Sequence, residues 1–130
     1  MIPDLPEDAV VEFLTFDVPV VERDVWLEHE ERHWSRFLEQ QPGFLGKQVW
    51  VETDRDSVVH AVIWWASLEQ WKAIPADELA RVEQAMGVHE RTPSCTTFAV
   101  VRERLRRRLR GAAAADAHLY AGVVPEPLSA

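Results

Sequence analysis

The run His29-Glu30-Glu31-Arg32-His33 holds the residues best suited to chemistry in this sequence of 130 residues. It matches the pattern H-E-x-x-H, in which two histidines one helical turn apart bind zinc and the glutamate activates water. A zinc protease needs a third ligand, and residues 34–41 contain neither glycine nor histidine. We therefore predict that the protein has no metal site. The alternative prediction is a divalent ion bound by His29 and His33.

The same run has a second interpretation as part of a ligand pocket. On a helix drawn at about 100° per residue, Glu30 lies inside the apolar stripe and His33 lies just beside it. A histidine next to a glutamate in an apolar pocket can titrate near neutral pH and transfer protons. We therefore predict His33 as the catalytic proton-transfer group and Glu30 as the residue that orients it.

Tryptophan is frequent in this chain, and all six tryptophans lie between positions 26 and 71. Large aromatic side chains fill protein cores, and they also stack against flat ligands. The predicted substrate-binding residues are Trp34, Trp64, Trp71, His60, Gln48 and Trp50. They would surround a pocket between a helix and a sheet, and the sequence leaves open which face of the sheet lines it.

The elements that position these residues follow a β-α-β-β-α-β order. Apolar and β-branched residues predict strands at 9–18, 44–53, 58–65 and 96–101. A first helix runs from about residue 20 to 41 and ends at Pro42-Gly43, because proline cannot continue a helix. A second helix begins at a capping box, Ser67 to Gln70, is interrupted at Pro75 and ends at Gly87. This order predicts an α+β, ferredoxin-like fold with a four-stranded antiparallel sheet.

Strands 9–18 and 58–65 are apolar on both sides, although helices can cover only one face of such a sheet. A second copy of the chain is the expected cover for the other face. The sequence thus predicts a homodimer that forms through the sheet and closes into a dimeric α/β barrel.

Charge divides the chain into three parts. Residues 1–8 are acidic and rich in proline, and we expect a flexible lead. Residues 9–101 form the predicted ferredoxin-like dimeric-barrel domain. Residues 102–130 carry six arginines and only three acidic residues, and they predict an Arg/Ala-rich, basic helical C-terminal extension.

The composition limits the kinds of partner that we expect for this protein. The net charge is −8, which argues against nucleic acid as a partner. No apolar run is long enough to span a bilayer, and the first residues lack the features of a signal peptide. The single cysteine, Cys95, suits a reducing compartment. We therefore expect a cytoplasmic protein whose partners are itself and a small-molecule ligand, without a nucleic acid or a membrane.

Three motifs carry a resemblance to a known superfamily. They are the hinge PGFLGKQVW at 42–50, the strand end Trp65-Ala66-Ser67 and the segment EQWKAIP at 69–75. The chain resembles the dimeric α/β-barrel superfamily, which includes the antibiotic-biosynthesis monooxygenases. It is most similar to small bacterial members without an assigned activity. The resemblance covers about residues 9–101.

The resemblance implies a homodimer with a pocket between the helices and the sheet of each subunit. It implies an aromatic or polycyclic ligand and a cofactor-independent monooxygenase, cyclase or isomerase of secondary metabolism. The alternative is a non-catalytic ligand-binding or accessory dimer. A third possibility is a heme-binding or heme-degrading protein, whose relatives place an axial histidine where this chain has Val82. Fold alone does not choose among these activities.

Overall fold

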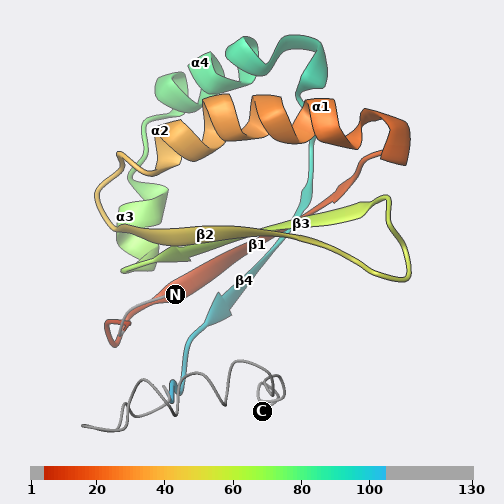
Figure 1. Cartoon of the computed structure of the whole chain (residues 1–130). Coiled ribbons are helices and arrows are strands. Elements are labelled where there is room, and N and C mark those ends of the chain that lie inside the picture. The colour runs from red at the N-terminus through yellow and green to blue at the C-terminus, as the bar shows by residue number, and fades with distance from the viewer. Residues whose placement is uncertain (1–4, 105–130) are drawn as a thin grey trace, which may run out of the picture.

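The computed structural model describes residues 5–104 and has the predicted order of strands and helices (Figure 1). The strands are β1 (Val10–Asp17), β2 (Phe44–Val51), β3 (Val58–Trp65) and β4 (Ser94–Ala99). The helices are α1 (Val20–Glu30), η1 (Glu31–Ser35), α2 (Arg36–Leu38), α3 (Leu68–Lys72), α4 (Ala76–Met86) and η2 (Gly87–His89). The predicted α+β, ferredoxin-like arrangement is thereby confirmed.

The four strands form one antiparallel sheet in the order β2-β3-β1-β4. The strand β1 is central, since it pairs with β3 on one side and with β4 on the other. Side chains alternate between the two faces of a strand. The register therefore puts Glu12, Leu14, Val59 and Ile63 on one face, and it puts Thr15 and its partner His60 on the other.

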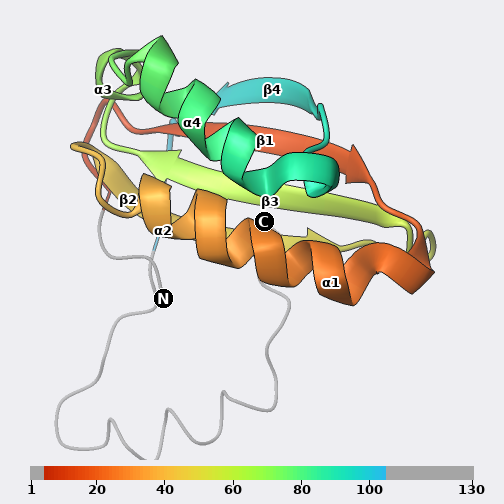
Figure 2. The ribbon, with the colours of Figure 1, turned by 90° about the horizontal axis from the view of Figure 1, so that it is seen from above.

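Helices α1 and α4 lie side by side over one face of the sheet, as the two views of Figures 1 and 2 show. The buried side chains gather between these two layers, where Trp26 of α1 packs against Phe16 of β1 with ring centroids 4.8 Å apart. Trp65 of β3 is fully buried and belongs to a second group with Leu38 and Ile63. The core thus holds the helices on the sheet.

The hinge after the first helix works as the sequence predicts. Gly43 has a φ of 89°, a conformation that other residues rarely adopt. Its carbonyl oxygen accepts a hydrogen bond from Ala66 N at 2.7 Å, so the hinge is tied to the end of β3. At the start of α3, Ser67 Oγ accepts from Gln70 N at 3.1 Å, which confirms the predicted cap.

The first helix differs from the prediction of one α-helix to residue 41. It is α-helical to Glu30, changes to a π-helix over Glu31–Ser35, and ends with α2 at Leu38. A π-helix has one more residue in each hydrogen-bonded turn, and such segments often occur at functional sites. The rotation that it introduces changes which side chains after Glu30 face the sheet.

Several strand ends also differ from the prediction, and β1 is one residue shorter at each end. The second strand ends at Val51, and the fourth spans Ser94–Ala99, two residues earlier than expected.

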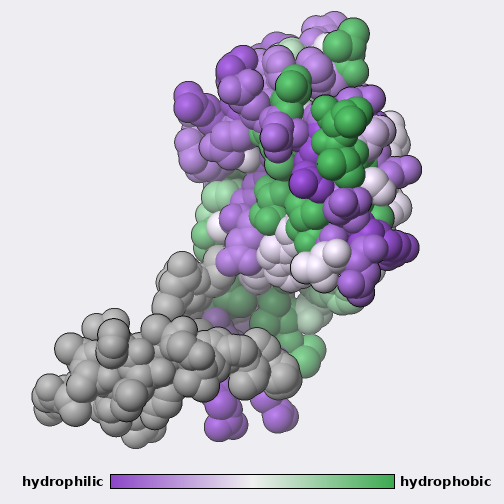
Figure 3. All heavy atoms as spheres, turned by 45° about the vertical axis from the view of Figure 1, so that its right-hand side comes forward, coloured by the Kyte–Doolittle hydropathy of each residue, from purple (hydrophilic) through white to green (hydrophobic). Residues whose placement is uncertain are grey.

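The predicted C-terminal extension lies almost wholly outside the described residues. Within residues 5–104, no helix has the length and apolar character to cross a membrane. Hydrophobic residues still reach the surface at several places on the face that Figure 3 shows.

Candidate functional site

A cavity of about 310 Å³ lies between the helices and the sheet. Its apolar walls come from both layers, with Leu14, Phe16 and Ile63 on the sheet and Leu38 and Leu79 on the helices. Its polar lining consists of Glu12, Glu30, Lys72, Glu83, Glu90 and Arg91. The sheet residues that line it belong to the face that the helices cover. The sequence alone left open which face of the sheet lines the pocket.

Glu12 places a carboxyl group on the sheet wall of this cavity. Burial raises its pKa above the usual value for glutamate, although three groups oppose this. Trp65 Nε1 donates a hydrogen bond to Glu12 Oε1 at 3.0 Å, and the charges of Lys72 and Lys47 also favour the carboxylate. Glu12 is therefore a carboxyl group that can hold a proton closer to neutral pH than a surface glutamate can.

Glu30 is buried, with 4% of its surface exposed, as its place in the predicted apolar stripe requires. Its partner is Lys47 of β2, whose Nζ forms an ion pair with Glu30 Oε2. The same Nζ donates to Ser35 Oγ of the π-helix at 2.6 Å. In the structure, Glu30 thus pairs with a lysine from the sheet.

Two predicted tryptophans line the cavity. Trp34 Nε1 donates to Glu90 Oε1 at 3.1 Å, and burial together with the charge of Glu83 raises the pKa of Glu90. Trp71 stacks on Trp65 with an interplanar angle of 6° and a centroid distance of 6.5 Å. These rings give the cavity flat aromatic surfaces next to hydrogen-bonding groups.

His33 lines a different hollow. This groove lies on the outer side of the helices, where η1 and α2 run beside α4, and His33 lines it together with Arg32 and Arg36. In the part of the chain that the structure describes, the groove and the cavity share no lining residue. The structure therefore separates His33 from Glu30, and the catalytic role of His33 stays a prediction.

The other four predicted binding residues lie on the sheet face that the helices leave open. They are Trp64, His60, Gln48 and Trp50. On this face, Trp50 Nε1 donates to Gln48 Oε1 at 2.9 Å, and the ring of Phe13 stacks on His60 with centroids 4.8 Å apart. They are therefore separated by the sheet from the cavity that holds Trp34 and Trp71, and their contact with a substrate stays a prediction.

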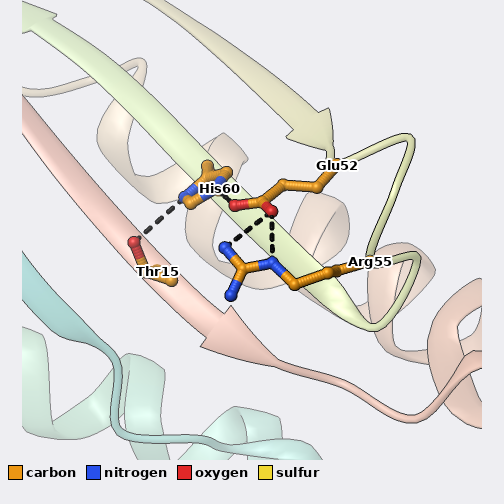
Figure 4. A network of polar contacts seen from close by, with 4 residues as sticks. All are labelled: Thr15, Glu52, Arg55 and His60. Carbon is orange, nitrogen blue, oxygen red and sulfur yellow. Dashed lines mark hydrogen bonds and ion pairs between the residues drawn. The ribbon is translucent and has the colours of Figure 1, made fainter.

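Figure 4 shows how His60 is held on that open face. Its Nδ1 lies 3.0 Å from Thr15 Oγ1, and its Nε2 lies 2.7 Å from Glu52 Oε2. Arg55 Nε donates to Glu52 Oε1 at 2.8 Å. The hydrogen bonds from His60 and Arg55 lower the pKa of Glu52, so its carboxylate form is favoured.

The imidazole rings of His29 and His33, the alternative metal ligands, are stacked on each other. The imidazole of His29 lies 4.0 Å from that of His89 and 6.0 Å from that of His33, centroid to centroid, and all three are nearly parallel. Ring nitrogens bind metals through lone pairs in the ring plane, so parallel stacked rings do not converge on one ion. Among residues 5–104, no group of three or more His, Cys, Asp or Glu is arranged to hold a metal.

Several charged residues of the cavity were absent from the predicted site. Glu12 is a charged residue in the middle of a mostly apolar strand, and this is the signal that could have identified it. Glu90 and Arg91 follow the helix α4 in a connecting segment, where no sequence pattern distinguishes them from surface charges. Only the folded chain brings them to the cavity.

Comparison with solved structures identifies proteins that have a similar fold. The chain is similar to the ActVA-Orf6 monooxygenase of Streptomyces coelicolor, solved in complex with nanaomycin D, with a TM-score of 0.64 and 16% identity over 78% of this chain and 95% of that one. The fold is that of the antibiotic-biosynthesis-monooxygenase-like proteins. The cofactor-independent oxygenase SnoaB from Streptomyces nogalater has it too, with a TM-score of 0.57 and 20% identity over 77% of this chain and 99% of that one.

A third similar structure shares this monooxygenase-like fold. It is MhuD, the heme degrader of Mycobacterium tuberculosis with two hemes bound in its active site. The TM-score is 0.55, with 27% identity over 73% of this chain and 98% of that one. A scan against family models and a search of curated proteins found no match. Proteins with this fold therefore include both cofactor-independent oxygenases and a heme degrader.

Proposed function

We propose that this protein binds a small aromatic molecule in the cavity between the helices and the sheet, and that Glu12 transfers a proton to or from it. The observation that carries the proposal is a partly buried carboxyl group, with a pKa raised by burial, on the wall of a largely apolar cavity. Perturbed carboxyl groups in such cavities are typical of functional sites.

The size and lining of the cavity support an aromatic ligand. Its volume of about 310 Å³ is at the lower end of the range for ligand pockets, roughly 300–1,000 Å³. A compact molecule of two or three fused rings suits this space. The indole rings of Trp34 and Trp71 supply flat surfaces, and Leu14, Ile63 and Leu79 supply the remaining apolar contacts. A protein with a core packed shut would offer no such volume.

The position of Glu12 supports proton transfer. Its Oε1 accepts the Trp65 hydrogen bond, which fixes the carboxyl group, and within the described residues its side chain makes no other hydrogen bond. One oxygen is therefore available to a ligand. A positioned carboxyl group can remove a proton from an acidic C–H or O–H group of an aromatic ketone or phenol. Cofactor-independent oxygenation, cyclisation and isomerisation of such molecules can all begin with that step.

A heme fits the cavity poorly. Among the described lining residues there is no histidine, cysteine, tyrosine or methionine, the residues that bind heme iron in most proteins. Val82, at the position where the resemblance would place an axial histidine, is buried and lines the outer groove. Four glutamates of the lining would also oppose the propionates of a heme. The lining of the cavity therefore does not favour heme as its ligand.

We also propose that a second copy of the chain covers the open sheet face. Phe98 and Trp50 are 51% and 44% exposed there, and the ring of Phe13 lies between them with centroid distances of 5.9 and 6.1 Å. An exposed aromatic cluster of this kind is typical of an interface. The cavity lies on the other side of the sheet, so dimerisation would leave it accessible.

Binding and chemistry can be tested separately. 1-Naphthol serves as the binding probe, followed by quenching of tryptophan fluorescence, and anthrone serves as the turnover probe, followed by oxygen uptake. Leu79→Trp should fill the cavity and abolish binding. Glu12→Gln should keep binding and lose turnover, while Glu69→Gln, on the exposed side of α3, should behave as the parent protein.

Each experiment tests a different part of the proposal. Binding to Leu79→Trp as strong as to the parent would exclude the cavity as the ligand site. Turnover by Glu12→Gln at the parent rate would exclude Glu12 as the proton-transfer group. Binding without any oxygen uptake by the parent protein would favour the non-catalytic, ligand-binding alternative.

A further inference from the structure

The groove that contains His33 is a separate feature of the helical layer. It has a volume of about 320 Å³ and lies between two helical segments, η1–α2 and α4, which run side by side in Figures 1 and 2. One side is lined by Arg32, His33, Arg36, Phe37 and Gln40, and the other by Glu78, Arg81, Val82 and Ala85. The cavity proposed for the aromatic ligand lies beneath the helices and does not include these residues.

Arginine is frequent in the lining of this groove, which includes Arg32, Arg36 and Arg81, although the whole chain carries a net charge of −8. Within residues 5–104, Arg32 and Arg36 have no ion-pair partner within 4.0 Å. Arg81 pairs with Asp77 at 3.2 Å, but both side chains are more than two-thirds exposed. An exposed pair of this kind is weak, so Arg81 can turn to another anion at little cost.

The two arginines of the first helix are also like charges four residues apart, an arrangement that destabilises a helix. Only one carboxylate, Glu78, belongs to the groove lining. An external anion would relieve the repulsion between the arginines. The π-helix lies at the same place, since Arg32 and His33 belong to it and Arg36 follows it directly. Irregular turns of this type frequently mark binding sites.

We propose that this groove binds a phosphate group. A guanidinium group is planar and donates paired hydrogen bonds that match the oxygens of phosphate or carboxylate. Three of them, from two helices, suit a dianion with three peripheral oxygens better than a carboxylate with two. His33 and Gln40 add donors at the same groove.

The phosphate can be free or part of a small organic molecule. Phe37, Val82 and Ala85 give the groove apolar lining next to the arginines. A phosphate ester with an apolar group would contact both parts, whereas inorganic phosphate would contact only the charged part. Both ligands present the same chemistry to the arginines.

The test is a titration of the full chain with inorganic phosphate at constant ionic strength, followed by the side-chain Nε–Hε signals of arginine in ¹H–¹⁵N NMR spectra. We expect saturable shifts of the signals of Arg32, Arg36 and Arg81. The double variant Arg32→Gln/Arg36→Gln should bind phosphate at least about tenfold more weakly, because it loses two charge-assisted contacts. Both arginines are exposed, so the variant should keep its fold, which circular dichroism checks.

A matched control changes the same charge elsewhere. Arg23 donates to Asp56 O at 2.5 Å, and Arg55 pairs with Glu52, so Arg23→Gln/Arg55→Gln removes two positive charges outside the groove. It should bind phosphate as the parent chain does. Non-saturable shifts, or equal weakening in both double variants, would overturn the proposal. Tighter binding of 2-naphthyl phosphate than of phosphate would assign the groove to a phosphate ester, and equal binding would assign it to free phosphate.

Discussion

Lys47 of β2 and Glu30 of α1 form an ion pair in the interior, where each side chain is at most 7% exposed. The pair connects the sheet to the first helix next to the cavity, whose lining includes Glu30. Lys47→Ala would leave the Glu30 carboxylate buried without a partner and should lower the free energy of unfolding by about 3–5 kcal/mol. Urea unfolding measures this. The exposed residue Lys72 provides the control, and its alanine variant should lose far less.

Removal of both charges should have a different effect. When a buried ion pair is replaced by apolar residues of similar volume, stability is often unchanged or higher. Glu30→Leu/Lys47→Met should therefore recover most of the stability that Lys47→Ala loses. If the double variant were as unstable as Lys47→Ala, the cost would have another origin than the unpaired carboxylate.

The raised pKa of Glu12 predicts a stability that falls as pH rises. The folded state holds this proton more tightly than the unfolded state, so the contribution is complete below the unfolded pKa of about 4.3 and is lost as pH rises through the folded pKa. Glu12→Gln removes this loss. Its melting temperature should exceed that of the parent protein by more at pH 8 than at pH 4. The exposed variant Glu69→Gln should show no such pH-dependent gain.

Glu52 should give the opposite slope. Its hydrogen bonds with His60 and Arg55 lower its pKa, so the stabilisation is present above the unfolded pKa of about 4.3 and is lost as pH falls through the folded pKa. Glu52→Gln should therefore reduce stability at neutral pH and have little effect at pH 3. Melting temperatures across this range check it, and an equal reduction at both pH values would contradict it.

Gly43 should be sensitive to any side chain. Its φ of 89° disfavours an L residue, and an added Cβ would lie only 2.6 Å from Gln70 Cβ. Backbone strain alone should cost about 1–3 kcal/mol in Gly43→Ala, and the close contact should add to it. Gly87 also has a positive φ, but an added Cβ there meets no atom within 4 Å. Chemical denaturation should thus show that Gly43→Ala is less stable than Gly87→Ala.

The proposed dimer can be tested at its aromatic cluster. Trp50→Glu and Phe98→Glu each put a charge on the open sheet face, which a second copy could bury only at high cost. Light scattering should find a dimer for the parent chain and a monomer for both variants. Val88→Glu is a suitable control, because Val88 is 95% exposed and lies in η2, away from that face. A monomeric parent chain would exclude the dimer.

The sequence predicted the elements well because their limits depend on local chemistry. Gly43 and Ser67 act through their own backbones or near neighbours, and the structure has both of them in the predicted role. The alternation in β3 likewise predicted that His60 and Trp64 share a face. These features need no knowledge of distant parts of the chain.

The site was predicted less well, because it depends on contacts between distant segments. The partner of Glu30 is Lys47, from a strand beyond the hinge, and the carboxyl group proposed for proton transfer is Glu12, from a strand before the helix. A plot at a constant angle per residue also cannot include a π-helix. It placed His33 at the margin of the inner face, whereas the structure has it in the outer groove.

The pairing of Val10 with Ala99 has a consequence for synthesis of the chain on the ribosome. The strand β1 emerges first, yet both of its neighbours in the sheet are made later, and β4 is the last of the four strands within residues 5–104. The centre of the sheet therefore cannot close while the chain is still short. A nascent chain that stops before Ser94 would leave one edge of β1 open, and a separate peptide with the sequence of β4 could occupy that edge.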